Sequence, residues 1–214
     1  MDIIQLENEL KKSYKDFFLF ALELTRSIDK NNSNLKFAVV NMQIALELFL
    51  KYYFLKKGKT DWLFSDLTKL KFKDFSVILD LFYRKDKKLL VTKKTHLKNI
   101  LEARNKIVHS GKDSWNEELA VNLINTTLFI QNVLNREFNE TLIETSIDPE
   151  NGLSGNEIWR KGTEDFAKNL AKLNNKKVYE CWFCYSKSFV DKKIFTCDEL
   201  DDEGFQCITC LNSF

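Results

Sequence analysis

The scarcity of glycine and proline limits what this chain can fold into. Its 214 residues include six glycines and one proline. These two residues break helices and mark tight turns, so their scarcity favours long helices with few sharp connections. Hydrophobic residues make up 44% of the chain and charged residues 30%, as in a typical water-soluble globular protein. Eighteen phenylalanines can fill an aromatic-rich core. The sequence therefore predicts a mainly α-helical fold.

Apolar residues recur at three- and four-residue steps, the spacing of one helix face, in several stretches. The first runs from Ile3 to about Ile28, and a second, more apolar stretch runs to Lys57 and is closed by Gly58. Another such stretch comprises Leu97, Ile100, Leu101, Arg104 and Val108. Thr92 is its expected cap, and Gly111 is its expected end. Further helices are expected over 75–83, over 114–140 and over 154–173, the last two beginning with capping boxes.

The N-terminus gives no indication of export. It is acidic from Asp2 and lacks the long apolar stretch of a signal peptide. The most apolar segment, from Leu35 to Leu55, is interrupted by polar and charged residues such as Glu47 and Lys51. This pattern predicts a buried bundle helix and not a membrane span. We therefore expect a cytoplasmic protein with no membrane partner.

An arginine, an asparagine and a histidine lie close together at the end of one expected helix. They are Arg104, Asn105 and His109, and the chain has only one other histidine, His96. Histidine can move a proton near neutral pH, arginine can hold phosphate oxygens, and asparagine can position an oxygen without adding charge. RNA cleavage needs these groups, because a 2′-hydroxyl loses its proton while the attacked phosphate gains charge. The plain alternative is a histidine favoured by the helix dipole beside an ordinary surface arginine.

The spacing of Arg104 and His109 along the helix has a consequence for the oligomeric state of the protein. Five residues at 100° each place Arg104 and His109 about 140° apart on an ideal helix. The two side chains would converge poorly within one subunit. Two such helices that met at a two-fold axis would bring two arginines and two histidines into one site. The catalytic hypothesis therefore includes a homodimer.

The motif resembles the signature of the HEPN superfamily, in which an arginine and a following polar residue precede a histidine by four to six positions. The resemblance covers roughly residues 1–140. It implies a four- to five-helix bundle and a metal-independent endoribonuclease with Arg104, Asn105 and His109 as catalytic residues at a dimer interface. Many members are toxins or phage-defence effectors that cut tRNA or other RNA, which implies an antitoxin or defence-system partner. It also implies that Glu47 braces Arg104; a simple surface pair with Lys51 is the alternative.

Charge is unevenly distributed around the motif. Between Lys51 and Lys98 there are fourteen lysine or arginine residues against five aspartates. Between Asp113 and Asp165 there are eleven acidic residues against three basic ones. A basic stretch that leads to a phosphate-handling site suits an RNA substrate. Lysines that merely solvate helix surfaces would give the same pattern.

All five cysteines lie in the last 38 residues. Two Cys-x-x-Cys pairs, Cys181 with Cys184 and Cys207 with Cys210, are 22 residues apart, close to the spacing of a four-thiolate zinc site. The segments 178–182, 193–196 and 205–208 have the composition of short strands. This pattern predicts a zinc ribbon with a structural Zn²⁺; disulfides are unlikely in a cytoplasmic chain. Cys197 is expected to be a small core residue, with substitution for one ligand as the alternative.

The only proline and two of the six glycines fall between Asp148 and Gly155, where we place the domain boundary. We expect a helical bundle over 1–145, a linker and connecting helix over 146–176, and the ribbon over 177–214. From Lys176 onward there are five lysines against seven acidic residues, so the ribbon as a whole is net negative. This charge disfavours the ribbon as an RNA clamp by itself and suits protein contact instead. Two function classes stay open: an endoribonuclease, or a non-catalytic dimerisation module that recruits protein or nucleic acid partners through the ribbon.

Overall fold

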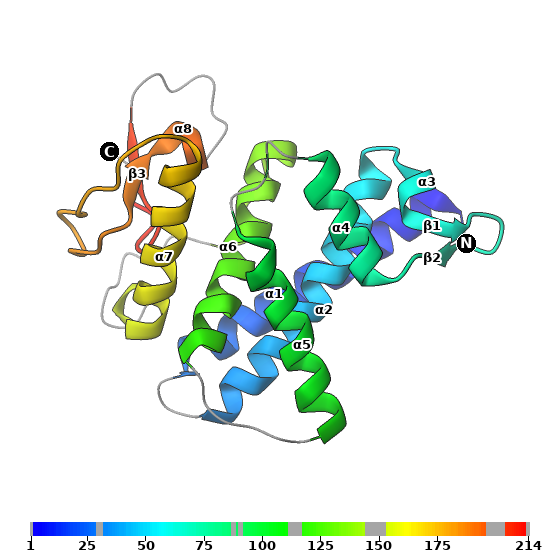
Figure 1. Cartoon of the computed structure of the whole chain (residues 1–214), viewed down its shortest axis with the longest axis horizontal. Helices are drawn as coiled ribbons and strands as arrows, with labels where there is room; N and C mark the ends of the chain where they lie inside the picture. Colours follow the sequence, from blue (N-terminus) through cyan, green and yellow to red (C-terminus); the bar gives the residue numbers. More distant parts are fainter. Residues whose placement is uncertain are drawn as a thin grey trace.

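The computed structural model describes residues 2–28, 32–86, 89, 92–110, 117–143, 153–195 and 204–212. Over these ranges the chain forms eight α-helices, one short 3-10 helix and two small antiparallel sheets. The expectation of a mainly helical protein with a small β region is confirmed. Figure 1 shows the cysteine-bearing segment and its neighbouring helix at one end of the molecule, and the first small sheet at the other.

Helices α1 (Ile3–Arg26) and α2 (Asn32–Lys56) form the longest helix pair. The Asp2 side chain begins α1 by accepting a hydrogen bond from the Gln5 N–H at 2.6 Å. The end of α2 lies at Gly58, as the sequence predicts. This residue has a φ of +67°. Its own N–H donates to the Leu55 carbonyl at 2.9 Å, and the Lys59 N–H donates to the Phe54 carbonyl at 2.8 Å. Only glycine adopts this conformation without strain, which explains why the helix stops there.

Helix α2 lies at the centre of the bundle. It contacts α1, α3, α4, α5 and α6, and its apolar residues are buried around much of its circumference. Within the described part of the chain, α2 is the one helix long and apolar enough to cross a membrane. In its most apolar window 67% of the residues are buried inside the protein. The burial agrees with its prediction as a bundle helix.

The segment after Gly58 holds short regular elements. Helix α3 (Thr60–Leu63) leads into strand β1 (Phe64–Asp66), which pairs antiparallel with β2 (Lys71–Phe72). The two rings of Phe64 and Phe72 stack across this sheet at 4.9 Å between centroids. Helix α4 (Phe75–Lys85) follows, two residues longer than expected. Phe64 is buried and Trp62 packs against the core.

Helix α5 (Lys94–Ser110) packs against α2 and α6. Leu97 and Ile100 are fully buried, whereas Val108, the last member of the expected apolar face, is 51% exposed. The expected cap is wrong: the Thr92 hydroxyl donates to the Asn125 carbonyl of α6 at 3.4 Å. Because Thr92 is buried against α6, a tertiary partner replaces the local one. The expected C-cap Gly111 lies outside the described residues.

Helix α6 (Glu117–Phe138) is buried on every side over its middle, from Asn122 to Leu134. Several of its polar side chains find hydrogen-bond partners inside the protein. Gln131, for example, accepts from the Leu142 and Ile143 N–H groups and donates to Asn135 and Thr141. A helix buried all round needs partners on both sides. The bundle covers one side, and α7 and the C-terminal segment cover the other (Figure 1).

Helix α7 (Glu157–Leu173) begins later than the predicted capping box implies. A 3-10 turn occupies Leu153–Gly155, and the cap is Asn156, whose side chain accepts from the Trp159 N–H at 2.8 Å. Gly162 allows α7 to approach α6 closely. A Cβ there would lie 2.6 Å from the Ile124 Cβ, so a larger residue would push the helices apart.

The C-terminal segment contains β3 (Phe189–Asp191), helix α8 (Lys192–Phe195) and β4 (Phe205–Cys207). Strands β3 and β4 pair antiparallel, and Tyr179 bridges to Phe189 on the other side of β3. The expected strand over 193–196 is wrong: residues up to Phe195 are helical. Ile194 and Phe195 are buried, and the Phe195 carbonyl accepts from Asn132 of α6 at 2.8 Å. Docking on α6 therefore determines the local conformation.

One continuous hydrophobic core joins these parts. It includes residues of α1 to α7 together with five ribbon residues: Val190, Ile194, Phe195, Ile208 and Leu211. The cysteines form a separate small cluster with Phe189 packed against it. The connecting helix α7 thus packs as a structural layer between α6 and the ribbon. Most of the segment between Asp148 and Gly155, where we expect the domain boundary, lies outside the described ranges.

Candidate metal centre and candidate active site

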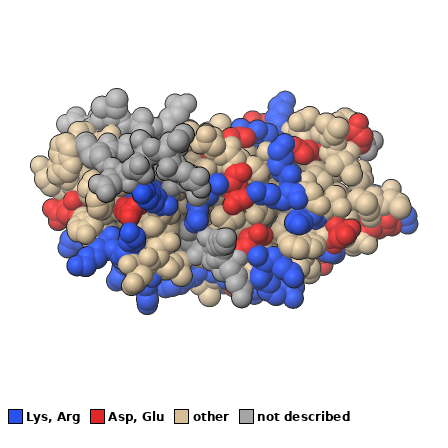
Figure 2. Space-filling model, turned by 90° about the horizontal axis from the view of Figure 1, so that it is seen from above, with Lys and Arg blue, Asp and Glu red and all other residues tan. Residues whose placement is uncertain are grey.

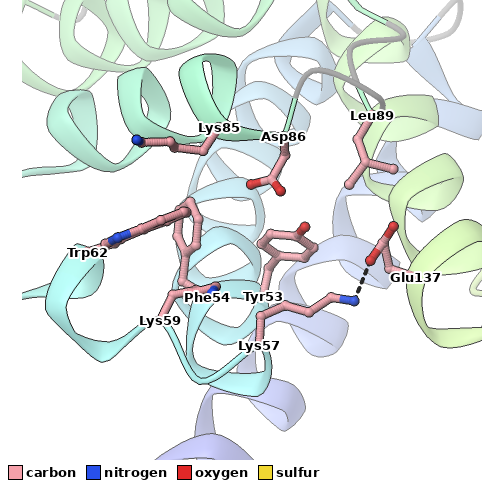
Figure 3. Close-up of a pocket in the computed structure, with 9 residues that line it drawn as sticks. All are labelled: Tyr53, Phe54, Lys57, Lys59, Trp62, Lys85, Asp86, Leu89 and Glu137. Carbon is pink, nitrogen blue, oxygen red and sulfur yellow. Dashed lines mark ion pairs between the residues drawn. The ribbon is translucent and has the colours of Figure 1, made fainter.

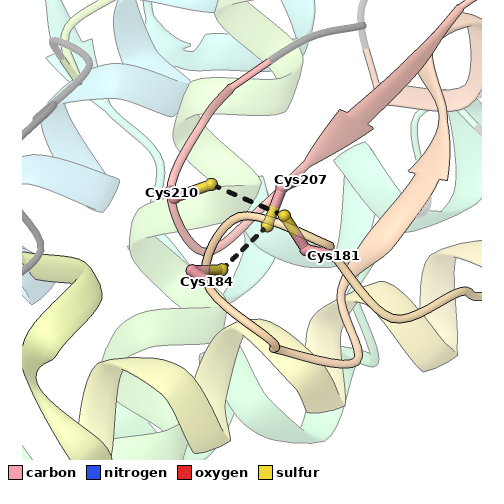
Figure 4. Close-up of side chains that lie close together, drawn as sticks. All are labelled: Cys181, Cys184, Cys207 and Cys210. Carbon is pink, nitrogen blue, oxygen red and sulfur yellow. Dashed lines mark hydrogen bonds between the residues drawn. The ribbon is translucent and has the colours of Figure 1, made fainter.

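The two Cys-x-x-Cys turns have the same backbone geometry. In the first, the Cys181 N–H donates to the Ser186 carbonyl and the Tyr185 N–H to the Cys181 carbonyl, both at 2.8 Å. In the second, Cys207 and Leu211 make the equivalent bonds at 2.9 and 2.8 Å. Each turn therefore curls two thiols toward the same side, and the two turns face each other (Figure 4).

The four thiols are spaced as a tetrahedral metal site requires. Their sulfur atoms all lie within 4.8 Å of one another. The pairs across the turns are 3.9 Å apart for Cys181 and Cys210 and 3.6 Å for Cys184 and Cys207. Zinc–sulfur bonds of about 2.3 Å in a tetrahedron place the sulfurs about 3.8 Å apart. The cluster can thus bind a metal ion such as zinc. These four cysteines are unpaired thiols, and Cys197 lies outside the described residues.

Buried hydroxyl groups surround Cys207, and sequence reasoning did not include them. Its sulfur lies 3.4 Å from the Ser186 Oγ and 3.2 Å from the Ser188 Oγ. Hydrogen bonds from Cys210 and from both serines lower the pKa of the Cys207 thiol, against the opposing effect of burial. A lowered pKa favours the thiolate, the form that binds metal. The sequence contains a signal for these hydroxyl groups, because Ser186 and Ser188 occupy alternate positions directly after the first turn.

The hydroxyl chain continues into α7. The Ser188 Oγ lies 2.7 Å from the Thr209 Oγ1, which lies 2.6 Å from the Thr163 Oγ1 of α7. The Trp159 indole N–H donates to the Thr209 carbonyl at 3.0 Å. Arg160 donates to the Cys184 carbonyl at 2.9 Å. Helix α7 therefore holds both turns by direct hydrogen bonds.

The second candidate site lies near the end of α5. The Arg104 Nη1 donates to the Asn105 Oδ1 at 3.0 Å, and the buried Arg104 Nε–H has no acceptor among the described residues. Arg104 is half-buried, whereas Asn105 and His109 are exposed. The Asn105 side-chain oxygen thus orients the guanidinium group, and its expected contact with a hydroxyl or phosphate stays a prediction. Over the described residues, Arg104 and His109 have no contact with each other.

Two neighbouring residues have other partners. Glu47 forms an ion pair with Lys51 at 2.7 Å and accepts from Gln43 at 3.4 Å. In the described part of the chain it makes no ion pair with Arg104, so the expected brace is not formed and the alternative pair is. His96 is a packing histidine: its Nδ1 lies 2.5 Å from the Asn122 Oδ1 of α6.

The acidic and basic stretches of the sequence partly neutralise each other. Lys57, from the basic stretch, forms an ion pair with Glu137 of the acidic stretch. Glu140 binds both Lys11 and Lys15 of α1, at 2.6 and 2.9 Å. Figure 2 shows basic side chains beside acidic ones across the face it draws. The basic stretch is therefore not a uniformly positive path.

A pocket of about 600 Å³ lies away from both sites, between the ends of α2, α4 and α6. Figure 3 shows the Asp86 carboxylate pointing toward the Tyr53 hydroxyl, with Trp62 at the far side. Burial raises the pKa of Asp86 and of Tyr53. The Lys59 and Lys85 ammonium groups lie 5.4 and 5.6 Å from the Trp62 ring. Opposite charges line this pocket, and neither Arg104 nor His109 reaches it.

Comparison with models of known protein families, with curated proteins and with solved structures gave no match to this chain.

Proposed function

We propose that the protein is a metal-independent endoribonuclease of the HEPN type. The observation that carries the proposal is the Arg104–Asn105 hydrogen bond on the last turns of α5, with an exposed His109 one turn further on. The arginine stabilises charge on the attacked phosphate. The histidine takes the proton from the 2′-hydroxyl, whose oxygen bonds to the phosphorus and breaks its bond to the 5′-oxygen of the next nucleotide. That oxygen leaves with a proton returned by the imidazolium. The products are a 2′,3′-cyclic phosphate and a 5′-hydroxyl.

The unsatisfied donor on Arg104 supports this role. A buried N–H without an acceptor costs about 1–3 kcal/mol. Such a group adds nothing to folding stability and calls for an explanation, which a phosphate acceptor would supply. The helical bundle of α1, α2, α5 and α6 also agrees with the HEPN-like architecture that the motif implies.

The proposal includes a homodimer with α5 at the two-fold axis. Arg104 and His109 point away from each other on one helix, so a complete site needs both subunits. Val108, beside His109, is 51% exposed and would be covered in this interface. Activity per protomer should therefore fall as the protein is diluted below its dimer dissociation constant.

The cofactor in this proposal is one structural zinc ion held by Cys181, Cys184, Cys207 and Cys210. The ion would join the two turns and would take no part in the cleavage step. In the cell we propose a cytoplasmic toxin or phage-defence effector, with an antitoxin or defence-system partner.

Substitution of the motif tests the proposal. Arg104→Ala and His109→Ala should each lower the rate of RNA cleavage at least about 100-fold, the usual contribution of a general acid–base group. Cleavage by the wild-type protein should persist in EDTA. The measurement is incubation of each protein with total RNA, with mass spectrometry of the product ends.

His96→Asn is the matched control, since His96 lies on the same helix and packs against α6. Its activity should remain, and circular dichroism should show that all variants are folded. Full activity of the His109→Ala variant would exclude this site. An absence of cleavage by the wild-type dimer would favour the non-catalytic binding module.

A further inference from the structure

Exposed aromatic side chains gather on the cysteine-bearing segment. Trp182 is 61% exposed and Tyr185 is 69% exposed, and both belong to the first Cys-x-x-Cys turn. Phe183, Tyr179 and Phe205 nearby are also exposed. Large aromatic groups are normally buried or placed where a partner covers them. We call these five residues the aromatic face.

The small sheet arranges part of this face as a platform. Tyr179 bridges to Phe189 of β3, and the Phe205 ring of β4 lies 5.4 Å from Tyr179 and 5.3 Å from Phe189 between centroids. Side chains alternate along a strand, so the next residue, Val190, points to the other side and is fully buried in the core. The sheet thus buries one face in the protein and presents aromatic rings on the other.

The two turns allow a direct comparison at equivalent positions. Tyr185 and Leu211 each follow the second cysteine of their turn, with φ of +57° and +59°. Glycine adopts this left-handed conformation without strain, whereas other residues do not. The Leu211 side chain is buried in the core, which explains why this position is a leucine and not a glycine. Tyr185 is exposed, so its side chain supplies nothing to the core and suits contact with a ligand.

Lysines lie beside the aromatic face. Residues 176–195 contain five lysines against Glu180 and Asp191, and Lys177, Lys187 and Lys193 are exposed. The five other acidic residues of the ribbon fall between Asp198 and Glu203. Residues 176–195, which carry four of the five aromatic side chains of the face, are therefore net basic, although the ribbon as a whole is net acidic.

A hollow of about 560 Å³ continues this surface toward α7. Tyr179 and Lys187 line it together with Lys168. Two of its carboxylates already have partners: Glu164 accepts from the Lys187 N–H and pairs with Arg160, and Asp165 accepts from two asparagines. Lys161 of the hollow pairs with Glu117 and Glu157, so Lys168 and Lys187 are the lysines placed to meet an anionic ligand that reaches the rings.

We propose that the aromatic face binds single-stranded RNA, with bases stacked on its rings and phosphates held by the adjacent lysines. Stacking on aromatic side chains combined with a basic surface is how proteins hold single strands without sequence readout. Protein–protein interfaces are depleted in lysine, whereas lysines are frequent in this segment. A protein partner therefore fits this face less well than RNA does. The choice of RNA rests on the proposed function, but the binding itself needs neither Arg104 nor His109.

A 2′-O-methylated oligouridylate of twelve nucleotides tests the proposal, because it lacks the 2′-hydroxyl nucleophile and cannot be cleaved. Fluorescence anisotropy should show binding to the wild-type protein. Trp182→Ala should weaken it roughly 5- to 150-fold, the effect of one lost stacking contact. Lys187→Gln should reduce the slope of log affinity against log salt concentration by about 0.7.

Tyr185→Gly separates binding from stability. It should weaken binding while the thermal midpoint stays equal or rises, because glycine removes the strain at a positive φ. Phe20→Ala and Phe37→Ala, equally exposed aromatics on α1 and α2, are matched controls that should bind as the wild type does.

Three outcomes would overturn the inference. The first is wild-type affinity in both the Trp182→Ala and Tyr185→Gly variants. The second is binding of a duplex of equal length as tightly as the single strand. The third is a change of oligomeric state in these variants without a change in binding, which would show that a second copy covers the face. Binding without RNA cleavage would refute the proposed enzyme alone, and cleavage without binding at this face would refute this inference alone.

Discussion

Ser188 connects the candidate metal centre to the rest of the protein. Its hydroxyl lies 3.2 Å from the Cys207 sulfur, accepts from the Thr209 N–H at 3.2 Å and is fully buried. Groups that hydrogen-bond to metal ligands hold them in position and tune the charge on the ligand atom. Single hydroxyl groups of this kind are therefore expected to affect metal affinity although they never touch the ion.

Ser188→Ala should lower zinc affinity about 10- to 100-fold, the usual effect of losing such a partner. Competition with a chelator of known affinity measures this directly. Ser65→Ala is the control, because Ser65 is exposed on β1, far from the cysteines in the fold. Equal zinc affinity in the Ser188 variant and the wild type would show that the hydroxyl chain has only a packing role.

At the level of elements, α6 holds the two halves of the molecule together. Its middle is buried on all sides, and the residue two positions beyond its end, Glu140, binds Lys11 and Lys15 of α1. Burial raises the pKa of the Glu140 carboxyl, but hydrogen bonds from the two lysines outweigh this and leave the pKa below its ordinary value. The ion pairs therefore stabilise the attachment of α1 to the α6 end when Glu140 is charged.

Glu140→Gln should lower the free energy of unfolding by about 1 kcal/mol near pH 7, because the pairs are partly exposed to solvent. A carboxyl with a lowered folded-state pKa contributes stability above its unfolded pKa. The difference between variant and wild type should thus be constant above the ordinary value of 4.5 and vanish as the pH falls through the lowered pKa. Denaturant titrations at several pH values measure it. A difference that stays unchanged in acid would argue for a loss of packing.

At the level of the whole molecule, the ribbon and the helices share one core while the cysteines form their own cluster. A segment of this size cannot bury enough apolar surface to fold without metal–thiolate bonds, worth about 10 kcal/mol or more. Ile208 and Leu211, however, belong to the common core. Loss of the metal should therefore disorder the turns and also weaken the helical part that the ribbon covers.

The Cys207→Ser, Cys210→Ser double variant tests this coupling. It should release zinc, lose hydrogen-exchange protection in β3 and β4, and keep most of its helical circular dichroism with a lower thermal midpoint. Cys197→Ser is the control and should keep one zinc ion per chain by elemental analysis. Zinc loss in that control would show that Cys197 is a ligand, and an unchanged midpoint in the double variant would show that the parts are independent.

The sequence by itself determined the features that depend on short-range chemistry. Three- and four-residue spacing located the helices, Gly58 ended α2, and two Cys-x-x-Cys pairs predicted a cluster of four thiols. Each of these depends on residues close together in the chain, so local patterns suffice.

Only the tertiary structure decided the rest. It buried α6 on every side, made Lys192–Phe195 a helix where a strand was expected, and left Val108 exposed at the end of α5. It also brought Thr163, Ser188 and Thr209 together behind the cysteines. The physical reason is common to all: these positions are set by contacts between segments far apart in the chain, and periodicity within one segment carries no information about what packs against its other face.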